Sequence, residues 1–271
     1  MVNEMEIEIL LETNRYLGTK ETAQHVFDLL CSYNHIIPTH FGTDEPLRNT
    51  FADNKDKFVE LWSSQDTFGC VIWQRNIQPK IEGMALFGKS RYPEFNKLSW
   101  TISIDSFDLI KPFLSNIMEF FGLNQFLFGY VCLKEEYYQN NILRNTPFFY
   151  NKRGEKIFHP PGSVSPILPV GLDLRKHIPG LYWLTLFGKI YVNWFGKDKI
   201  KTAPAYKIIE LPKDAICLQL YEDPTLYNEQ SSQEIVKSVK RHLGEKAFFD
   251  ISDIDRETIA PNIDVSEITL C

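Results

Sequence analysis

Residues 179–200 read PGLYWLTLFGKIYVNWFGKDKI, and this stretch decides the fold. Residues 181–187 are apolar at every position except a threonine, so both faces of an extended chain would be apolar. That pattern is typical of a strand buried on two sides. Residues 188–195 then place apolar side chains at helical spacing, which predicts a short helix ending at Gly196. The stretch therefore predicts a buried strand in the core of a sheet, with a helix packed beside it.

The aromatic side chains of this stretch are expected to fill the core, because each large ring removes about 150–250 Å² from water when it is buried. Trp183 is therefore interpreted as a structural residue. Tyrosine and tryptophan are also the usual anchors of protein interfaces. Tyr182 and Trp194 are on that ground the two aromatic candidates for binding a partner.

Periodicity and turn residues predict the elements on either side. In the N-terminal half these are a strand at 5–11, a helix at 19–33 capped by Thr19, a short helix at 53–62, strands at 67–74, 81–88 and 97–104, a helix at 106–121 with Pro112 in its first turn and Gly122 at its end, and a strand at 126–133. In the C-terminal half they are a hairpin of 205–211 with 215–222 and a helix from Ser231, in a capping box with Glu234, to Gly244.

The order of these elements predicts an α+β fold with a mostly antiparallel central sheet packed by several helices. We expect a single domain over residues 1–271. An alternative description is two intimately packed ββαβ-like halves, at about 81–132 and 205–251, with a proline-rich junction near 145–169. Both descriptions remain open at this point.

Composition limits the classes of function. The 271 residues carry a formal net charge of −6, which argues against a broad nucleic-acid footprint, since that requires clustered lysine and arginine. No apolar run reaches the length of a membrane span, and the N-terminus does not resemble an export signal. The five cysteines are odd in number and form no CxxC pair, so reduced thiols and a cytoplasmic location are expected.

The sequence shows no catalytic, cofactor-binding or metal-binding motif. It has no GxSxG elbow, no Walker loop, no GxGxxG turn and no HExxH pair. Acidic pairs such as Glu135–Glu136 and Glu222–Asp223 fall at the ends of predicted elements, where a solvated surface explains them. We therefore expect no cofactor, no metal and no enzyme, and favour a protein that works by binding.

Residues 178–224 resemble the C-terminal region of bacterial immunity proteins from polymorphic-toxin and type VI secretion systems. The similar groups are the immunity protein fifty-two family and the related type VI immunity (TsiV-like) group. The resemblance rests on the start at 180–183, on Phe187–Gly188, on Gly196 after an aromatic helix, and on 203–206 and 218–224. It implies a cytoplasmic antidote that binds a cognate toxin and blocks it. Composition and hydropathy, as above, give the expectation that neither a nucleic acid nor a membrane is a partner. Glu222 and Asp223 are candidates for steering a basic toxin.

Two other classes of function remain open. One is a small-molecule-modifying α+β enzyme of the acetyltransferase-like kind, although the Q/R-x-x-G-x-G/A turn that would bind a pyrophosphate is missing. The other is a structural or regulatory module that forms a homo-oligomer through its aromatic surface. The genes beside this one would discriminate among the three.

Overall fold

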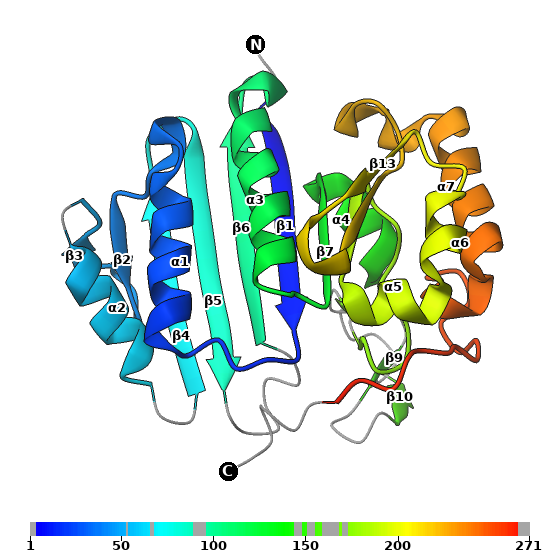
Figure 1. The fold of residues 1–271 in the computed structure, drawn as a ribbon, viewed down its shortest axis with the longest axis horizontal. Coiled ribbons are helices and arrows are strands. Elements are labelled where there is room, and N and C mark those ends of the chain that lie inside the picture. Colours follow the sequence, from blue (N-terminus) through cyan, green and yellow to red (C-terminus); the bar gives the residue numbers. More distant parts are fainter. Residues whose placement is uncertain are drawn as a thin grey trace.

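A computed structural model describes residues 4–52, 54–65, 68–88, 96–143, 148–150, 155–158, 168–169 and 173–264. Within these residues, ten strands form one sheet in the order β13-β14-β12-β7-β1-β6-β5-β4-β2-β3 (Figure 1). Every neighbouring pair of strands in this sheet is antiparallel. The α+β fold with a mostly antiparallel sheet is thus confirmed. Much of the proline-rich junction near 145–169 lies outside the described residues.

The strands of the large sheet have the following bounds. They are β1 (Met5–Thr13), β2 (His40–Gly42), β3 (Asn49–Thr50), β4 (Phe68–Arg75), β5 (Lys80–Gly88), β6 (Asn96–Ile104), β7 (Phe128–Leu133), β12 (Leu184–Phe187), β13 (Lys207–Glu210) and β14 (Ile216–Gln219). Two small pairs are formed by β8 (Ile142–Leu143) with β11 (Leu168–Pro169), and by β9 (Phe148–Tyr150) with β10 (Lys156–Phe158).

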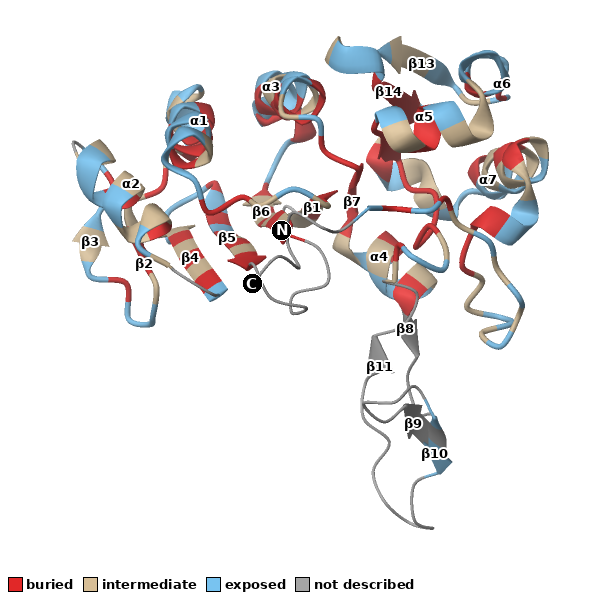
Figure 2. Cartoon of the chain, turned by 60° about the horizontal axis from the view of Figure 1, so that its bottom comes forward, coloured by how far each residue is buried: buried red, intermediate tan, exposed pale blue. Residues whose placement is uncertain are grey.

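The helices are α1 (Lys20–Cys31), α2 (Lys55–Ser63), α3 (Lys111–Leu123), α4 (Lys134–Asn141), α5 (Lys189–Phe195), α6 (Lys197–Lys201) and α7 (Gln230–Leu243). Short 3-10 turns are η1 (Asn34–Ile36), η2 (Phe107–Leu109), η3 (Pro212–Asp214), η4 (Pro224–Asn228) and η5 (Glu245–Ala247). Helices α1, α2 and α3 cover one face of the sheet, whereas α4 lies on the opposite side, beside β7 (Figure 2). Burial alternates along β6: every second side chain is buried, and the side chains between them are polar and half-buried.

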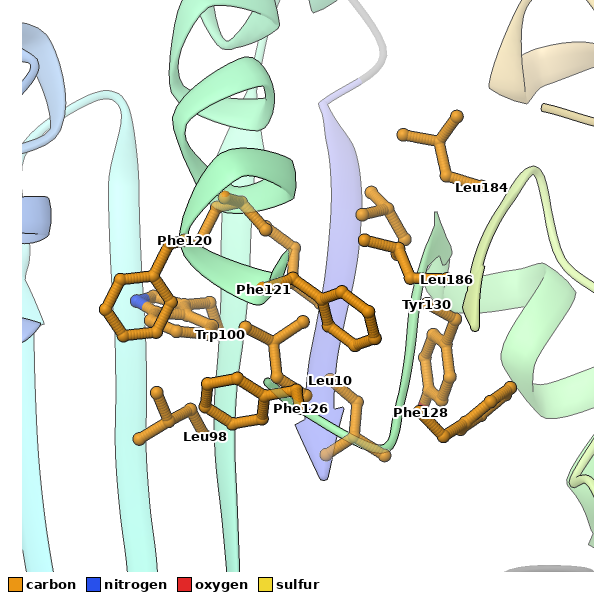
Figure 3. Close-up of a cluster of buried hydrophobic side chains, with 14 of the residues drawn as sticks. Leu10, Leu98, Trp100, Phe120, Phe121, Phe126, Phe128, Tyr130, Leu184 and Leu186 are labelled. Carbon is orange, nitrogen blue, oxygen red and sulfur yellow. The ribbon is translucent and has the colours of Figure 1, made fainter. Parts of the chain in front are cut away.

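A continuous hydrophobic core joins the two halves of the chain (Figure 3). Under α3, the ring of Phe126 lies 5.7 Å from that of Phe120 and 6.0 Å from that of Phe121, measured between centroids. On β7, Phe128 lies 6.3 Å from Phe187 of β12 and 6.2 Å from Tyr191 of α5. The ladder from β7 to β12 therefore carries both the backbone pairing and the core across the midpoint of the chain.

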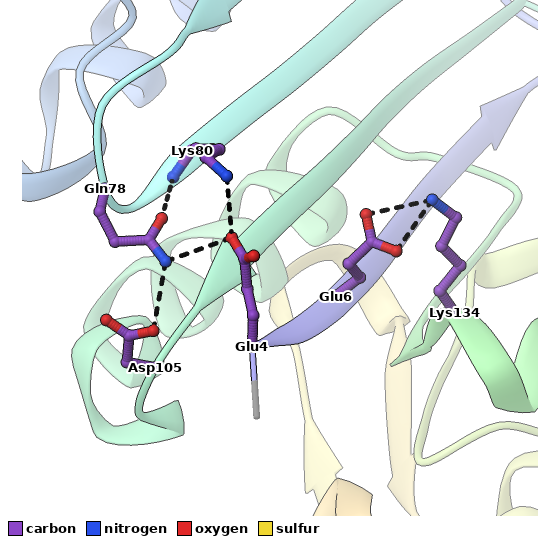
Figure 4. A network of polar contacts seen from close by, with 6 residues as sticks. All are labelled: Glu4, Glu6, Gln78, Lys80, Asp105 and Lys134. Atoms are coloured by element: carbon purple, nitrogen blue, oxygen red, sulfur yellow. Dashed lines mark hydrogen bonds and ion pairs between the residues drawn. The ribbon is translucent and has the colours of Figure 1, made fainter. Parts of the chain in front are cut away.

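A polar network fixes the start of β1 (Figure 4). The Glu4 carboxylate accepts hydrogen bonds from Gln78 Nε2 at 3.3 Å and from Lys80 Nζ at 3.2 Å. Glu6 pairs with Lys134 at 3.0 Å, which ties the first residue of α4 to the central strand. Exposed pairs of this kind contribute little stability, about 0–1 kcal/mol each. The Glu6–Lys134 pair marks where α4 begins beside β1, and α4 contributes to the site described below.

The stretch 179–200 folds largely as expected. β12 is shorter than predicted, but all four of its residues are buried, as a strand covered on both sides requires. α5 follows directly and ends at Gly196, whose φ of 91° favours glycine. The hairpin of β13 with β14 and the Thr19 cap of α1 are also confirmed, since the Thr19 side chain accepts from the Thr22 N–H.

Three sequence-based expectations differ from the structure. Gly122 lies inside α3, which ends at Leu123, and the chain reverses at Gln125 with a φ of 54°. Ser231 is not an N-cap, because α7 begins at Gln230 and no side chain caps it. The second half also lacks the last strand of the suggested ββαβ repeat within the described residues, where Phe248 makes only a parallel bridge to Ile178.

Four of the five cysteines lie in the described residues, and all four are free thiols, as expected. Burial raises the pKa of the Cys132 and Cys217 thiols, so both remain protonated. Within the described part of the chain, no helix combines the length and the apolar character that spanning a bilayer would require.

Candidate functional site

The four residues proposed from sequence as partner-binding occupy different environments. Tyr182 is fully buried, and its hydroxyl accepts a hydrogen bond from Asn141 Nδ2. Its ring centroid lies 4.3 Å from that of Tyr130 on β7. Because no part of the side chain reaches the surface, the assignment of Tyr182 to partner binding is corrected, and the residue belongs to the core.

Glu222 and Asp223 follow β14. The side chain of Glu222 is exposed, as a steering charge would have to be. Asp223 Oδ1 accepts hydrogen bonds from the Thr225 N–H at 2.9 Å and from Thr225 Oγ1 at 2.6 Å, so Asp223 caps η4. Asp223 therefore has a local structural task, and the steering role of the pair stays a prediction.

Trp194 is half-buried on α5 and lies at the edge of an open depression of about 670 Å³. We call this depression the Trp194 hollow. Its lining includes Trp194, Phe195, Lys199, Arg241, Lys246 and Ile259. The Trp194 ring packs against Phe195 at a centroid distance of 4.7 Å. The hollow thus combines aromatic and aliphatic surface with three cationic side chains.

A second, more enclosed cavity of about 430 Å³ lies between α4 and α7 and shares Arg241 and Glu245 with the Trp194 hollow. We call it the α4–α7 pocket. Three groups of residues line it, together with Leu181 before β12. They are Glu136, Gln139 and Asn140 of α4; Tyr227 of η4 with Gln233, Val236, Lys237, Lys240 and Arg241 of α7; and Glu245, Asp250, Ser252 and Arg256 after α7. Figures 1 and 2 place α4 and α7 in the same half of the molecule, the half that holds β12, β13 and β14.

The segment after α7 closes one side of the pocket and is held by its own polar contacts. Asp250 Oδ1 accepts from the Ser252 N–H at 3.0 Å and from Ser252 Oγ at 2.6 Å, which lowers the pKa of the Asp250 carboxyl. Arg256 pairs with Asp250 at 3.5 Å and donates to the carbonyl of Glu245 at 2.8 Å. The arginine is therefore committed to holding this segment against the end of α7.

Lys240 lies on the pocket side of α7. Its Nζ donates to the Phe249 carbonyl at a long distance of 3.5 Å and lies 5.9 Å from the centroid of the Phe248 ring. Burial lowers the pKa of Lys240, and nearby Asp250 offsets only part of that effect. The ammonium group is thus short of acceptors in its present surroundings.

Glu136 lines the α4–α7 pocket and is only 4% exposed. Burial raises its pKa from the ordinary value of 4.5 to about 8, although the Tyr221 hydroxyl and the Trp183 N–H lower it. Among the described residues, Glu136 Oε2 has no hydrogen-bond partner of good geometry. At neutral pH the group is therefore mainly a neutral carboxylic acid, which can donate a hydrogen bond as well as accept one.

The raised pKa of Glu136 predicts a dependence of stability on pH. The folded protein keeps the proton up to about pH 8, whereas the unfolded chain releases it near pH 4.5. The contribution of this group to the free energy of unfolding is therefore fully present below pH 4.5, and it is lost as the pH rises through 8. We expect Glu136→Gln to remove this loss, which amounts to about 2–4 kcal/mol. Urea denaturation of both proteins between pH 5 and pH 9 measures it.

Glu135→Gln is the matched control, because Glu135 is the exposed neighbour of Glu136 on the same helix. Its pH profile should follow that of the unmodified protein. Glu12, a second buried carboxyl with a pKa raised to about 7, titrates in all three proteins and cancels from the comparison. Parallel profiles for Glu136→Gln and the unmodified protein would contradict the assignment of Glu136 as a neutral acid.

Sequence reasoning missed the α4–α7 pocket. Helix α4 has few apolar residues, so its sequence KEEYYQNN carries no amphipathic signal, and Glu136 was interpreted as a solvated charge. A usable signal did exist in α7. Gln233, Lys237 and Lys240 recur at intervals of four and three residues and therefore share one helical face, beside the face that holds Val239 and Leu243.

Fold and site together define a class, an α+β protein with a long antiparallel sheet and a cationic pocket beside an aromatic hollow. In the described residues, no group of three or more histidine, cysteine, aspartate or glutamate side chains is arranged to hold a metal ion. No protein-family model matches the chain, and no curated protein is significantly similar to it.

Proposed function

We propose that this chain is an immunity protein that binds a cognate bacterial toxin in the cytoplasm and neutralises it by occupancy. The resemblance of residues 178–224 to such proteins suggests the class. The observation that carries the proposal is the Trp194 hollow, a surface depression that presents a half-buried tryptophan. Tryptophan is one of the residues enriched among the side chains that contribute most binding energy at protein interfaces.

The composition of the hollow indicates what the partner presents. Phe195 and Ile259 offer apolar surface, and Ile259 is 51% exposed. Lys199, Arg241 and Lys246 line this surface together with one carboxylate, Glu245, which lies 3.9 Å from Arg241, so the lining has a net positive charge. An apolar side chain flanked by aspartate or glutamate would complement both features, and the rim charges would raise the rate of association.

Neutralisation by occupancy requires tight and stoichiometric binding, because a few free toxin molecules suffice to harm a cell. A nanomolar complex corresponds to about −12 kcal/mol, which an interface of roughly 1,600 Å² with a few good anchors can supply. Protection should then rise with the amount of this chain and reach its limit at one molecule per toxin.

The test is co-expression with the protein encoded beside this chain, followed by co-purification and titration of toxicity. We expect Trp194→Ala to weaken the complex by about 2 kcal/mol, which is roughly 30-fold in affinity. Phe68→Ala is the control, since Phe68 is a partly exposed aromatic residue on β4, near the other edge of the sheet. It should leave affinity unchanged.

Two results would overturn the proposal. One is a neighbouring protein that is harmless when expressed alone. The other is protection by amounts of this chain far below one per toxin, since that requires turnover and favours the enzyme alternative. Equal loss of affinity in Trp194→Ala and Phe68→Ala would reject the Trp194 hollow as the binding surface.

A further inference from the structure

The α4–α7 pocket has the size of a site for a small molecule. Its volume of about 430 Å³ falls inside the range of about 300–1,000 Å³ that is usual for ligand pockets. Two helices and the segment after α7 enclose it, so a ligand would be surrounded on three sides. It is separate from the open Trp194 hollow, although both adjoin the end of α7.

The charges that line this pocket are not balanced. Four cationic side chains, Lys237, Lys240, Arg241 and Arg256, face two carboxylates, Glu245 and Asp250. Those two carboxylates already have arginine partners, because Asp250 pairs with Arg256 at 3.5 Å and Glu245 lies 3.9 Å from Arg241. Glu136, the third acidic group, is mainly neutral at pH 7 because burial raises its pKa to about 8.

The excess positive charge belongs to Lys237 and Lys240. Neither forms an ion pair with any acidic group that the structure describes. They are three residues apart on α7, so both reach the same side of the helix. Asp250 and Glu245 act on Lys240 only from beyond ion-pair distance. The lining therefore keeps an excess of two positive charges in a protein of net charge −6, which indicates a local preference for an anion of about two negative charges.

Glu136 provides the second, independent observation. Glu136 is only 4% exposed and lines the pocket. The Tyr221 hydroxyl and the Trp183 N–H act on its carboxyl, but Oε2 has no hydrogen-bond partner of good geometry among the described residues. A buried polar atom left in this way costs free energy unless a ligand or water satisfies it. A metal cation or an amine is disfavoured at this carboxyl by the lysines that line the same pocket, whereas a hydroxyl group can both donate to it and accept from it.

The remaining polar lining also suits hydroxyl groups. Gln139, Asn140 and Gln233 present amides that donate and accept, and Ser252 adds a hydroxyl. A phosphate monoester carries about −1.5 to −2 charges at pH 7 and offers three acceptor oxygens, which matches the two unpaired lysines. A polyhydroxyl body attached to that phosphate matches the amides and the neutral acid.

We propose that the α4–α7 pocket binds a phosphate monoester of a small polyhydroxyl compound, such as a sugar phosphate, with the phosphate on Lys237 and Lys240 and the hydroxyl groups directed to Glu136 and the amides. This inference does not depend on the toxin-binding function. The pocket and the Trp194 hollow share Arg241 and Glu245, so ligand in the first is adjacent to a partner at the second.

Isothermal titration calorimetry of the full chain with ribose 5-phosphate, ribose and inorganic phosphate tests the proposal. We expect ribose 5-phosphate to bind at a single site, inorganic phosphate to bind at least tenfold more weakly, and ribose to give no measurable heat. Lys237→Gln should weaken binding of ribose 5-phosphate at least tenfold. Lys237 is exposed, so this variant is expected to fold, and Lys240→Gln supplies a second one.

Lys207→Gln is the matched control, because it removes one exposed lysine from β13, outside the pocket, and leaves the same net charge as Lys237→Gln. It should bind like the unmodified protein. The proposal is overturned if ribose 5-phosphate does not bind at millimolar concentration, or if Lys207→Gln weakens binding as much as Lys237→Gln does. Equal affinity for inorganic phosphate and ribose 5-phosphate would overturn the assignment of the polyhydroxyl body.

Discussion

Replacing Trp183 with alanine is expected to lower the free energy of unfolding by about 3–5 kcal/mol, the usual cost of removing a buried tryptophan. Trp183 is only 4% exposed, and its ring meets that of Phe107 edge-on at a centroid distance of 4.8 Å. Its Nε1–H donates to the Tyr221 carbonyl at 2.9 Å. Alanine would leave a cavity and remove one of the two donors to the Tyr221 carbonyl, to which Gln219 Nε2 also donates at 3.2 Å, and both effects act in the same direction.

Urea denaturation followed by fluorescence and circular dichroism measures this loss. Trp194→Ala is the matched control, because it makes the same chemical change in the same stretch at a half-buried position. It should cost less than about 2 kcal/mol, in keeping with a site on the surface. If the two variants had the same denaturation midpoint, Trp183 would not be the structural residue that its burial indicates.

The contrast between these tryptophans shows how far sequence reasoning reaches in this protein. The apolar pattern of 181–187 correctly predicts an element buried on both faces, because alternation in a strand is a direct consequence of backbone geometry. The pattern does not predict that Trp194 reaches the surface whereas Tyr182 is buried. That distinction depends on β7 and α4, which are remote in sequence and which cover Tyr182.

The same reasoning explains why the order of elements was predictable and the α4–α7 pocket was not. Long strands such as β5 and β6 carry a strong local pattern of alternating burial. The pocket has no local pattern of its own, since Glu136 lies in α4 and Lys240 in α7, more than a hundred residues later. A raised pKa of a carboxyl arises only when folding removes it from water, so its sequence neighbours could not reveal it.

The second large effect is expected at Gly188, where α5 begins. Gly188 has a φ of −73°, which any residue adopts, so conformational freedom does not account for the glycine. The reason is close packing against the segment before β7. A Cβ atom at this position would lie 1.9 Å from the Phe126 carbonyl oxygen and 2.9 Å from that of Leu127. The Gly188 N–H also donates to the Leu127 carbonyl at 2.9 Å.

Gly188→Ala must therefore separate backbone from backbone, since no flexible side chain is available to move aside. The displaced segments are the entry to β7 and the junction of β12 with α5, which join the two halves of the sheet. We expect a loss of about 3 kcal/mol or more in the free energy of unfolding, at the upper end of the range for overpacking. Urea denaturation and the yield of soluble protein measure it.

Gly180→Ala provides the matched control, because it adds the same methyl group eight residues earlier at another buried glycine. There the nearest atoms belong to the Tyr182 ring at 3.4 Å, which is an ordinary van der Waals distance. Its stability should change by less than about 1 kcal/mol. If Gly188→Ala were as stable as Gly180→Ala, the backbone before β7 would be able to move aside at no cost in free energy. The inference that close packing at Gly188 holds the two halves of the sheet rigidly together would then be wrong.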